Sequence, residues 1–363
     1  MSGAAIPARV GRGPTWHALS AILALALPAL PAPAAPWVPT APVELVVPAG
    51  GGGGADQMAR FIAKVVADRK LMAQPITVLN KPGNSGVEGL QYIKAEAGNP
   101  HRLVITLSNL FTAPLASGVD FSWHDITPVQ MLALDQFVLW VNAASPYKTT
   151  KDLIDAMRAA PQGSLKLGGT GAKQEDQLIA VLMQSALGVR LSYVPLKGGG
   201  DVARALAATE VDMTVNNPIE AEALWRDGTL RPLCVFDGQR LAYPAKLAGA
   251  RSWADLPTCM SQGLPVQYLM MRGIFTSPGV TAEQLAFYNQ LLDKVRAQPE
   301  WRAFMDLGAF KQSTMAGDEF GHWLDKADSF HRVLMREAGF KAPQPGVALP
   351  VEPAKQAAAA KKK

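Results

Sequence analysis

Five consecutive glycines, Gly50–Gly54, are the residues whose type and spacing most clearly suit ligand binding. Glycine has no Cβ and tolerates positive φ, so backbone N–H groups in such a run can approach a ligand closely. The largely apolar segment 43–47 precedes the run, and Asp56 stands where the N-cap of a following helix is expected. A strand, a glycine turn and a helix N-terminus together predict an anion-binding site.

Other interpretations fit a glycine run taken by itself. A Walker loop is excluded, because no Gly-Lys-Ser/Thr follows to contact a terminal phosphate. A dinucleotide-binding loop fits loosely, since Gly50 and Gly52 are in place but Ala55 stands in the third position. A flexible turn without a ligand is the remaining alternative, and it weakens if a second such loop occurs elsewhere.

A second loop of this kind, Gly168–Gly171, follows the strand expected at residues 165–167 and precedes a helix with apolar residues on one face. A third glycine run, Gly198–Gly200, precedes Asp201, another expected helix N-cap. The first and second loops, one in each domain, could therefore close on one ligand from opposite sides.

Asn216 and Asn217 stand at the carboxyl end of the strand expected at residues 211–215. In open α/β sheets, ligands bind at the carboxyl ends of the strands. Asn before Pro218 is also common in turns, so both a ligand contact and a turn remain open for this pair.

Strands and helices alternate along the chain, which predicts an α/β protein with doubly wound sheets. A chain of 363 residues is long enough for two domains with separate cores. We expect a crossover near Asn142 and a return of the late helices to the first domain. These two interdomain crossovers place lobe 1 at 42–142 plus 271–342, and lobe 2 at 143–270.

The two ends carry the excess positive charge. Residues 1–34 have the layout of a secretory signal peptide, with Arg9 and Arg12 before an apolar stretch too short to span a bilayer. Residues 346–363 are rich in Pro, Ala and Lys, and we expect a disordered tail. These ends hold six of the 35 basic and one of the 30 acidic residues, which leaves 29 of each sign between them. The chain is expected to be exported, with no nucleic-acid partner.

Cys234 and Cys259 are the only cysteines. In an oxidising compartment they could form one disulfide, although buried, unreactive thiols are equally compatible with two cysteines. Two cysteines are too few for a cysteine-based zinc site, and the five histidines show no helical ligand spacing. We expect neither a metal nor a cofactor.

Several motifs between residues 42 and 340 resemble the substrate-binding proteins of tripartite tricarboxylate transporters, the Bug-type periplasmic receptors. In chain order they are Pro48–Asp56 with Ala59-Arg60, Asn80–Gly83 with Gly86 and Gly89, Asp125–Val129, Gly168–Gly171, Val194–Gly198, Val211-Asp212, and Asp255–Thr258 with Gly263–Pro265. The resemblance implies a type II-like, two-lobed periplasmic binding fold, a Venus flytrap. It also implies a monomer that closes on a small organic carboxylate and presents it to the membrane subunits of the transporter.

Binding in this family uses loop amides, hydroxyls and ordered water, which fits glycine loops at helix N-termini. The family's loop positions correspond to residues 52–56 and 169–171, and the strand ends and neighbouring loops supply further candidates. The expected ligand-binding residues are Gly52, Gly53, Gly54, Ala55, Asp56, Ser85, Ser108, Asn109, Gly169, Thr170, Gly171, Lys173, Asn216, Asn217 and Arg272.

The sequence departs from the family pattern at the loops and at one strand. Residues 172–177 replace a small polar loop that ends in Ser and His, and Met271-Arg272 replaces an aromatic pair. Lys173 and Arg272 could each bring a cation to the ligand's carboxylate. The alternatives are a solvated lysine and an arginine paired with a structural carboxylate.

We expect non-catalytic capture of an organic anion for uptake. An enzyme is disfavoured, because the sequence has no Gly-x-Ser-x-Gly elbow, no His-Glu-x-x-His helix and no cysteine in a nucleophile context. A receptor that signals to a membrane sensor protein is the alternative, and the sequence does not separate it from uptake.

Overall fold

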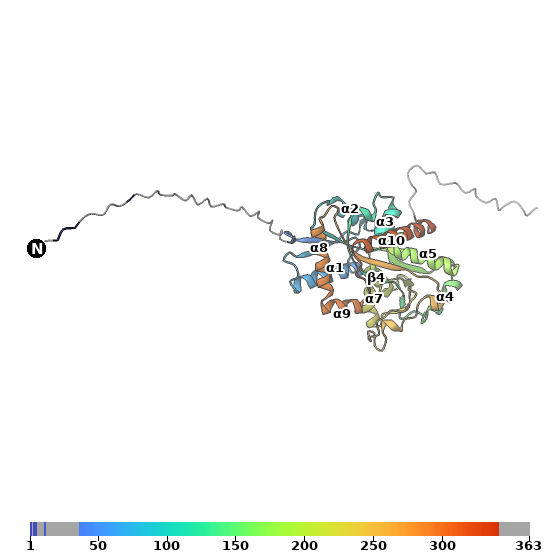
Figure 1. Ribbon diagram of the computed structural model, residues 1–363. Coiled ribbons are helices and arrows are strands. Elements are labelled where there is room, and N and C mark those ends of the chain that lie inside the picture. The colour runs from blue at the N-terminus through green and yellow to red at the C-terminus, as the bar shows by residue number, and fades with distance from the viewer. Residues whose placement is uncertain (2, 6–10, 12–35, 341–363) are drawn as a thin grey trace, which may run out of the picture. The chain divides into compact units, whose positions relative to one another are not determined.

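The computed structural model describes residues 36–340, together with residues 1, 3–5 and 11. Most of the expected signal peptide and the whole expected tail at 346–363 therefore lie outside the described residues. Residues 37–340 group into one compact unit, shown in Figure 1.

The first sheet has six strands in the order β11-β4-β10-β3-β1-β2. Their bounds are β1 (Val43–Val47), β2 (Ile76–Asn80), β3 (Arg102–Thr106), β4 (Thr127–Gln136), β10 (Leu269–Thr276) and β11 (Lys311–Gln312). Strand β1 pairs in parallel with β2 and β3, whereas β10 pairs antiparallel with β3 and β4. The sheet is therefore mixed, with the parallel strands at its β2 end.

The second sheet has five strands in the order β7-β6-β8-β5-β9. Their bounds are β5 (Val138–Asn142), β6 (Lys166–Thr170), β7 (Ser192–Leu196), β8 (Met213–Thr214) and β9 (Leu230–Val235). Strand β6 pairs in parallel with β7 and β8, and β5 pairs antiparallel with β8 and β9.

Helices cover both faces of each sheet. Their bounds are α1 (Gly54–Asp68), α2 (Val87–Ala95), α3 (Asn109–Ser117), α4 (Thr150–Ala159), α5 (Glu175–Leu187), α6 (Gly199–Ala207), α7 (Pro218–Arg226), α8 (Ala282–Arg296), α9 (Pro299–Leu307) and α10 (Gly317–Glu337). On β1, Leu45 and Val47 pack with α1 and α8, while Val46 packs with α2 and α10. This alternation confirms the predicted doubly wound α/β class, because neighbouring strand residues point to opposite faces.

The chain passes between the sheets twice. Strand β4 ends at Gln136 and β5 begins at Val138, so the first passage is at Phe137. The sequence placed it near Asn142, but Val138–Asn142 pairs with β9 and so belongs to the second sheet. The return lies between Val235 and Leu269, and α10 then lies beside α3 (Figure 1). The division into lobe 1 at 42–142 plus 271–342 and lobe 2 at 143–270 stays a prediction.

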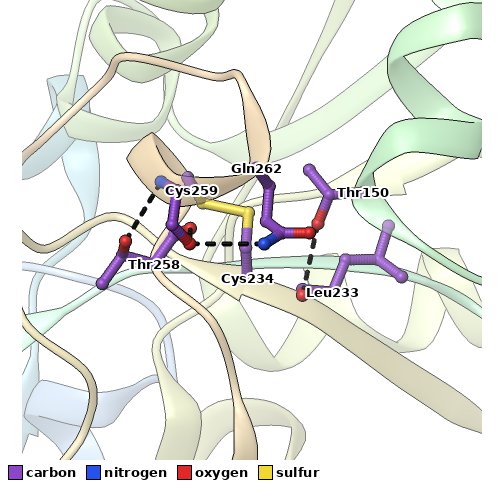
Figure 2. Close-up of a disulfide and its surroundings, with 7 residues drawn as sticks. Thr150, Leu233, Cys234, Thr258, Cys259 and Gln262 are labelled. Atoms are coloured by element: carbon purple, nitrogen blue, oxygen red, sulfur yellow. Dashed lines mark hydrogen bonds between the residues drawn. A yellow bond between two sulfur atoms is a disulfide. The ribbon is translucent and has the colours of Figure 1, made fainter.

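Cys234 on β9 and Cys259 form a disulfide (Figure 2), with Cα atoms 4.9 Å apart. Both residues are fully buried in the core of the second sheet. The backbone on each side also pairs, because Cys259 N–H donates to the Val235 carbonyl at 2.8 Å. Of the two alternatives left by the sequence, the structure has the disulfide.

Replacing both cysteines by alanine should lower the free energy of unfolding by about 3 kcal/mol, because the disulfide closes a loop over a sequence separation of 25 residues in the unfolded chain. Urea denaturation of the oxidised wild type and the double variant measures this difference. Equal unfolding midpoints and slopes would contradict a stabilising role for the bridge.

Candidate functional site

The β1–α1 loop meets the β7–α6 loop across the two lobes. Gly53 is the N-cap of α1 and Gly198 is the N-cap of α6. A Cβ atom at Gly50 would lie 2.7 Å from the Lys197 carbonyl oxygen, and a Cβ at Gly198 would lie 3.3 Å from the Gly50 Cα. Only glycine permits this approach of two backbones. The first glycine loop therefore contacts the third glycine run directly, whereas the expected closure of the first and second loops on one ligand stays a prediction.

Hydrogen bonds join the lobes around this contact. Gly54 N–H donates to Glu220 Oε1 at 2.9 Å, and Gln57 Nε2 donates to the Ile219 carbonyl at 3.2 Å. At a second place, Gln174 Nε2 donates to the carbonyl of Ser85, whose hydroxyl donates to the Ala172 carbonyl at 3.4 Å. The two lobes are thus in a closed arrangement.

A small cavity lies between the lobes where these loops converge. Six of the expected residues line it: Gly53, Gly54, Ala55, Asn109, Thr170 and Asn217. Its volume is about 30 Å³, which is room for about two water molecules. A solute larger than water would need the side chains or loops around the cavity to move.

The carboxylate of Glu220 occupies the place where the sequence predicts a bound anion. Besides Gly54 N–H, it accepts hydrogen bonds from Asn216 Nδ2 at 3.0 Å and from Asn217 N–H at 3.1 Å. It also lies directly against Gly199, in the space that a Cβ atom would need. A side chain of the protein thus sits at the N-termini of α1 and α6, where helix dipoles favour negative charge.

The sequence placed residues 168–170 in a loop, but they form the end of strand β6, and a carboxylate of the chain also contacts this segment. Thr170 N–H donates to Asp176 Oδ2 at 2.7 Å, and a Cβ at Gly169 would lie 2.5 Å from the Asp176 Cβ. The Tyr193 hydroxyl donates to the Gly171 carbonyl at 2.9 Å on the other side. Gly169 and Gly171 therefore lie outside the cavity lining, where they allow close packing of this segment against Asp176 and Gln174.

Hydrogen bonds to the Asp56 carboxylate stabilise the glycine loop between β1 and α1. Asp56 is in the first turn of α1 rather than at its N-cap, which corrects the expected role. Its carboxylate accepts from Gly52 N–H at 2.8 Å, from Asn80 Nδ2 at 3.0 Å and from Arg60. Burial would raise the pKa of Asp56, but these hydrogen bonds outweigh it and lower the pKa below its ordinary value. Gly52 and Asp56 thus fix the loop's shape outside the cavity lining.

Arg272 lies behind the cavity wall, fully buried with Asp135. Its Nε and Nη2 atoms donate to Asp135 Oδ2 at 2.9 and 2.6 Å, and Nη2 also donates to Asn217 Oδ1 at 3.2 Å. The guanidinium packs against Gly54, where it would collide with a Cβ. This arrangement corresponds to the alternative of an arginine paired with a structural carboxylate.

The remaining expected residues also stand outside the cavity lining. Lys173 is exposed on its loop with φ of 59°, so the structure places it as a solvated lysine. Ser108 is buried as the N-cap of α3, and Asn216 lies beneath Glu220 and donates to the Gly199 carbonyl at 2.8 Å. Ser85 joins the lobes through the hydrogen bonds described above.

Four polar residues that line the cavity were not predicted: Gln174, Glu175, Asp176 and Glu220. Glu175 and Asp176 begin α5 directly behind the second glycine loop, so their position in the sequence was a usable signal. Glu220 belongs to α7 and meets Gly54 only through the tertiary fold. Among the described residues, no group of three or more His, Cys, Asp or Glu side chains could hold a metal ion.

The buried carboxyls beside the cavity have raised pKa values. Burial raises the pKa of Glu175 to about 7, opposed in part by backbone N–H groups and by Arg272. Burial also raises the pKa of Asp176 well above its ordinary value, despite the hydrogen bond from Thr170. Taking a carboxylate out of water disfavours its charged form unless a cation compensates.

The stability of the ligand-free protein should therefore fall as the pH rises. A folded-state pKa of about 7 for Glu175, against an ordinary 4.5, gives a contribution that is full below about pH 4.5 and lost through about pH 7. Between about pH 5 and pH 8 we expect the wild type to lose about 2.5 kcal/mol more than Glu175→Gln, which cannot ionise. Denaturation of both proteins across this range measures the difference, and identical pH profiles would contradict it.

Comparisons with known proteins identify a family. The model of the tripartite tricarboxylate transporter family receptor, TctC, matches residues 58–262. A UPF0065 protein and Protein BugT, both from Bordetella pertussis, are each 28% identical over 206 and 210 residues, respectively 56% and 55% of this chain. Those matches span 63% and 61% of the relatives' own lengths, which is somewhat less than two thirds.

A solved R. palustris protein with adipate is 24% identical, with a TM-score of 0.74, and the match covers 83% of this chain and 98% of that one. A likeness at this identity shows the fold, and it confirms the predicted two-lobed periplasmic binding architecture. No helix within residues 36–340 has the length and apolar character needed to cross a membrane. Since the family model covers more than half of the chain, this protein belongs to the tripartite tricarboxylate transporter receptor family, whose members are periplasmic solute receptors and not enzymes.

Proposed function

We propose that the protein captures a small organic carboxylate in the cleft between its lobes and presents it to the membrane subunits of a tripartite transporter. Export to the periplasm through the segment 1–34, and action as a monomer, belong to the same proposal. Family membership supports the class of receptor. The solved relative with adipate supports a small carboxylate as ligand.

The observation that carries the proposal is the contact between glycine loops of the two lobes. A Cβ atom at Gly50 would collide with the Lys197 carbonyl oxygen, and one at Gly198 would lie tightly against Gly50. Hydrogen bonds from Gly54 to Glu220 and from Gln174 to Ser85 cross the same interface. A solute held between the lobes would add contacts to both, and contacts that exist only when the lobes are shut favour the closed state.

Thermal denaturation of the purified mature protein with a panel of organic acids tests the proposal. A ligand that binds only the folded state raises the melting temperature, by an amount that grows with its concentration relative to Kd. We expect a shift with at least one class of small carboxylate, using refolded protein that carries no solute from the cell. No shift with any acid of a broad panel would contradict capture of a carboxylate.

A further inference from the structure

We propose that the cleft contains an ammonium-binding subsite formed by Glu175, Asp176 and Asn109, and that the captured solute carries a protonated amine. This inference rests on the proposed function, because it assigns the amine to the same solute whose carboxylate that function assumes. The class of ligand is then a small amino acid or a related zwitterion rather than a simple dicarboxylate.

Two buried acceptor atoms beside the cavity have no hydrogen-bond partner among the described residues. They are Glu175 Oε1 and Asn109 Oδ1, on side chains that are 5% and 2% exposed. Both residues line the cavity. An acceptor left unsatisfied in a protein interior costs about 1–3 kcal/mol, so these atoms favour a ligand that donates hydrogen bonds.

An ammonium group supplies the donors that these atoms lack. It has three N–H donors and no acceptor, whereas an ionised carboxylate has acceptors only. The Asn109 side-chain amide is fixed in orientation, because its Nδ2 already donates to the Pro48 carbonyl at 3.0 Å. Its Oδ1 atom is therefore the hydrogen-bond acceptor that remains available to a ligand.

The charge of the cavity points to the same ligand chemistry. Three carboxyl side chains line it, those of Glu175, Asp176 and Glu220, and no Lys, Arg or His residue does. The nearby guanidinium of Arg272 is committed to Asp135, with hydrogen bonds of 2.9 and 2.6 Å. A second carboxylate on the ligand would meet like charges in a poorly solvated space, whereas a cation would offset them.

The other two carboxylates that line the cavity already have backbone N–H partners, whereas Glu175 Oε1 has none. In this chain Glu220 and Asp176 already accept from the loop residues Gly54 and Thr170. Glu175 has no such loop partner at Oε1, so its charge is the one that a ligand cation would compensate. Arg272 offsets the burial of Glu175 only in part, and Glu220 adds negative charge. Tyr193 and Tyr268, whose pKa values rise through burial, supply no positive charge.

Matched pairs of acids that differ only by an amino group test the subsite. Suitable pairs are succinate with aspartate, glutarate with glutamate, and adipate with 2-aminoadipate, each titrated calorimetrically against the mature protein at about pH 8. We expect the amino member of the best pair to bind about tenfold more tightly, as for one charge-assisted hydrogen bond. Glu175→Gln should remove most of that preference, because the variant lacks the carboxylate that compensates the ammonium group.

Glu222→Gln is the matched control variant. Glu222 is also 5% exposed, but it lies outside the cavity lining and pairs with Arg226. Its replacement should leave the amine preference unchanged. Circular dichroism and the melting temperature of both variants establish that each is folded.

The pH dependence distinguishes the subsite from a protonated Glu175 that donates to a ligand carboxylate. With an ammonium ligand, affinity should rise as the pH increases from about 6 to about 8, because the carboxyl ionises while an ordinary amine stays protonated. Affinity that falls over this range, or plain acids that bind as tightly as their amino partners, would overturn the subsite while leaving the proposed function intact. Binding of an amine without a carboxylate, such as putrescine, together with no binding of any acid, would support the subsite and contradict the proposed function. Absence of binding by every acid and amine would overturn both.

Discussion

Arg272→Met should lower the free energy of unfolding by about 3–5 kcal/mol. The substitution leaves Asp135 as an uncompensated charge, and both side chains of this pair are fully buried. The orphaned carboxylate would lose two hydrogen bonds at Oδ2, and Asn217 Oδ1 would lose a third from the same guanidinium. Guanidinium chloride denaturation of wild type and variant measures the change.

Two further variants separate charge burial from lost packing. Arg226→Met removes a half-exposed arginine that pairs with Glu222 at 3.4 Å, and it should cost less than about 1 kcal/mol. Asp135→Leu combined with Arg272→Met removes both buried charges and should recover most of the lost stability. A double variant as unstable as Arg272→Met alone would show that the pair matters for packing and not for charge.

Gly50→Ala should weaken ligand binding by about 10- to 100-fold while leaving the fold intact. The added Cβ would lie 2.7 Å from the Lys197 carbonyl oxygen, and that atom is backbone of the other lobe. Gly50 is not among the glycines with positive φ, so alanine fits the local conformation. The steric conflict of about 1–3 kcal/mol therefore falls on the closed state alone.

Calorimetric titration of the ligand found in the thermal panel measures this loss. Gly321→Ala on α10 is the matched control, because a Cβ there meets nothing within 4 Å. It should bind like the wild type and be slightly more stable, since alanine favours helix. Unchanged affinity in Gly50→Ala would mean that the ligand-bound form does not bring these two loops together.

Elements whose type depends on neighbouring residues could be predicted from the sequence. Strand Val43–Val47, the glycine run and the helix behind it are contiguous, so their type follows from apolar periodicity and from the lack of a Cβ. The same holds for Asn109, Thr170 and Asn217, which end strands or begin helices and which line the cavity. Local patterns thus indicated these elements and part of the cavity lining.

Contacts between residues that are far apart in the chain could not be predicted from the sequence. Gly54 and Glu220 are 166 residues apart, so no spacing rule indicates that this carboxylate reaches the α1 N-terminus. The pairing of Arg272 with Asp135, 137 residues away, is likewise set by the antiparallel pairing of β10 with β4. Glu175 could have been found, because a carboxylate directly behind a glycine loop suggests that the cavity is not simply an anion site.

Two carboxylates of the chain occupy backbone N–H groups at the glycine loops. At Glu220 and Asp176 the chain supplies its own carboxylates to backbone N–H groups that a ligand anion could otherwise use. These internal anions hold the loops in place, since helix N-termini and charge-assisted hydrogen bonds both favour them. A ligand anion therefore cannot use these N–H groups while Glu220 and Asp176 hold them.

A crystal structure of the mature protein with the acid that gives the largest thermal shift tests the central claim most directly. The account predicts ligand density between the lobes, within hydrogen-bond distance of residues that line the cavity, among them Gly53, Asn109 and Thr170. It also predicts contact of the two glycine loops at Gly50 and Gly198 in that complex. A ligand bound outside this cleft, or lobes held apart around it, would contradict the account.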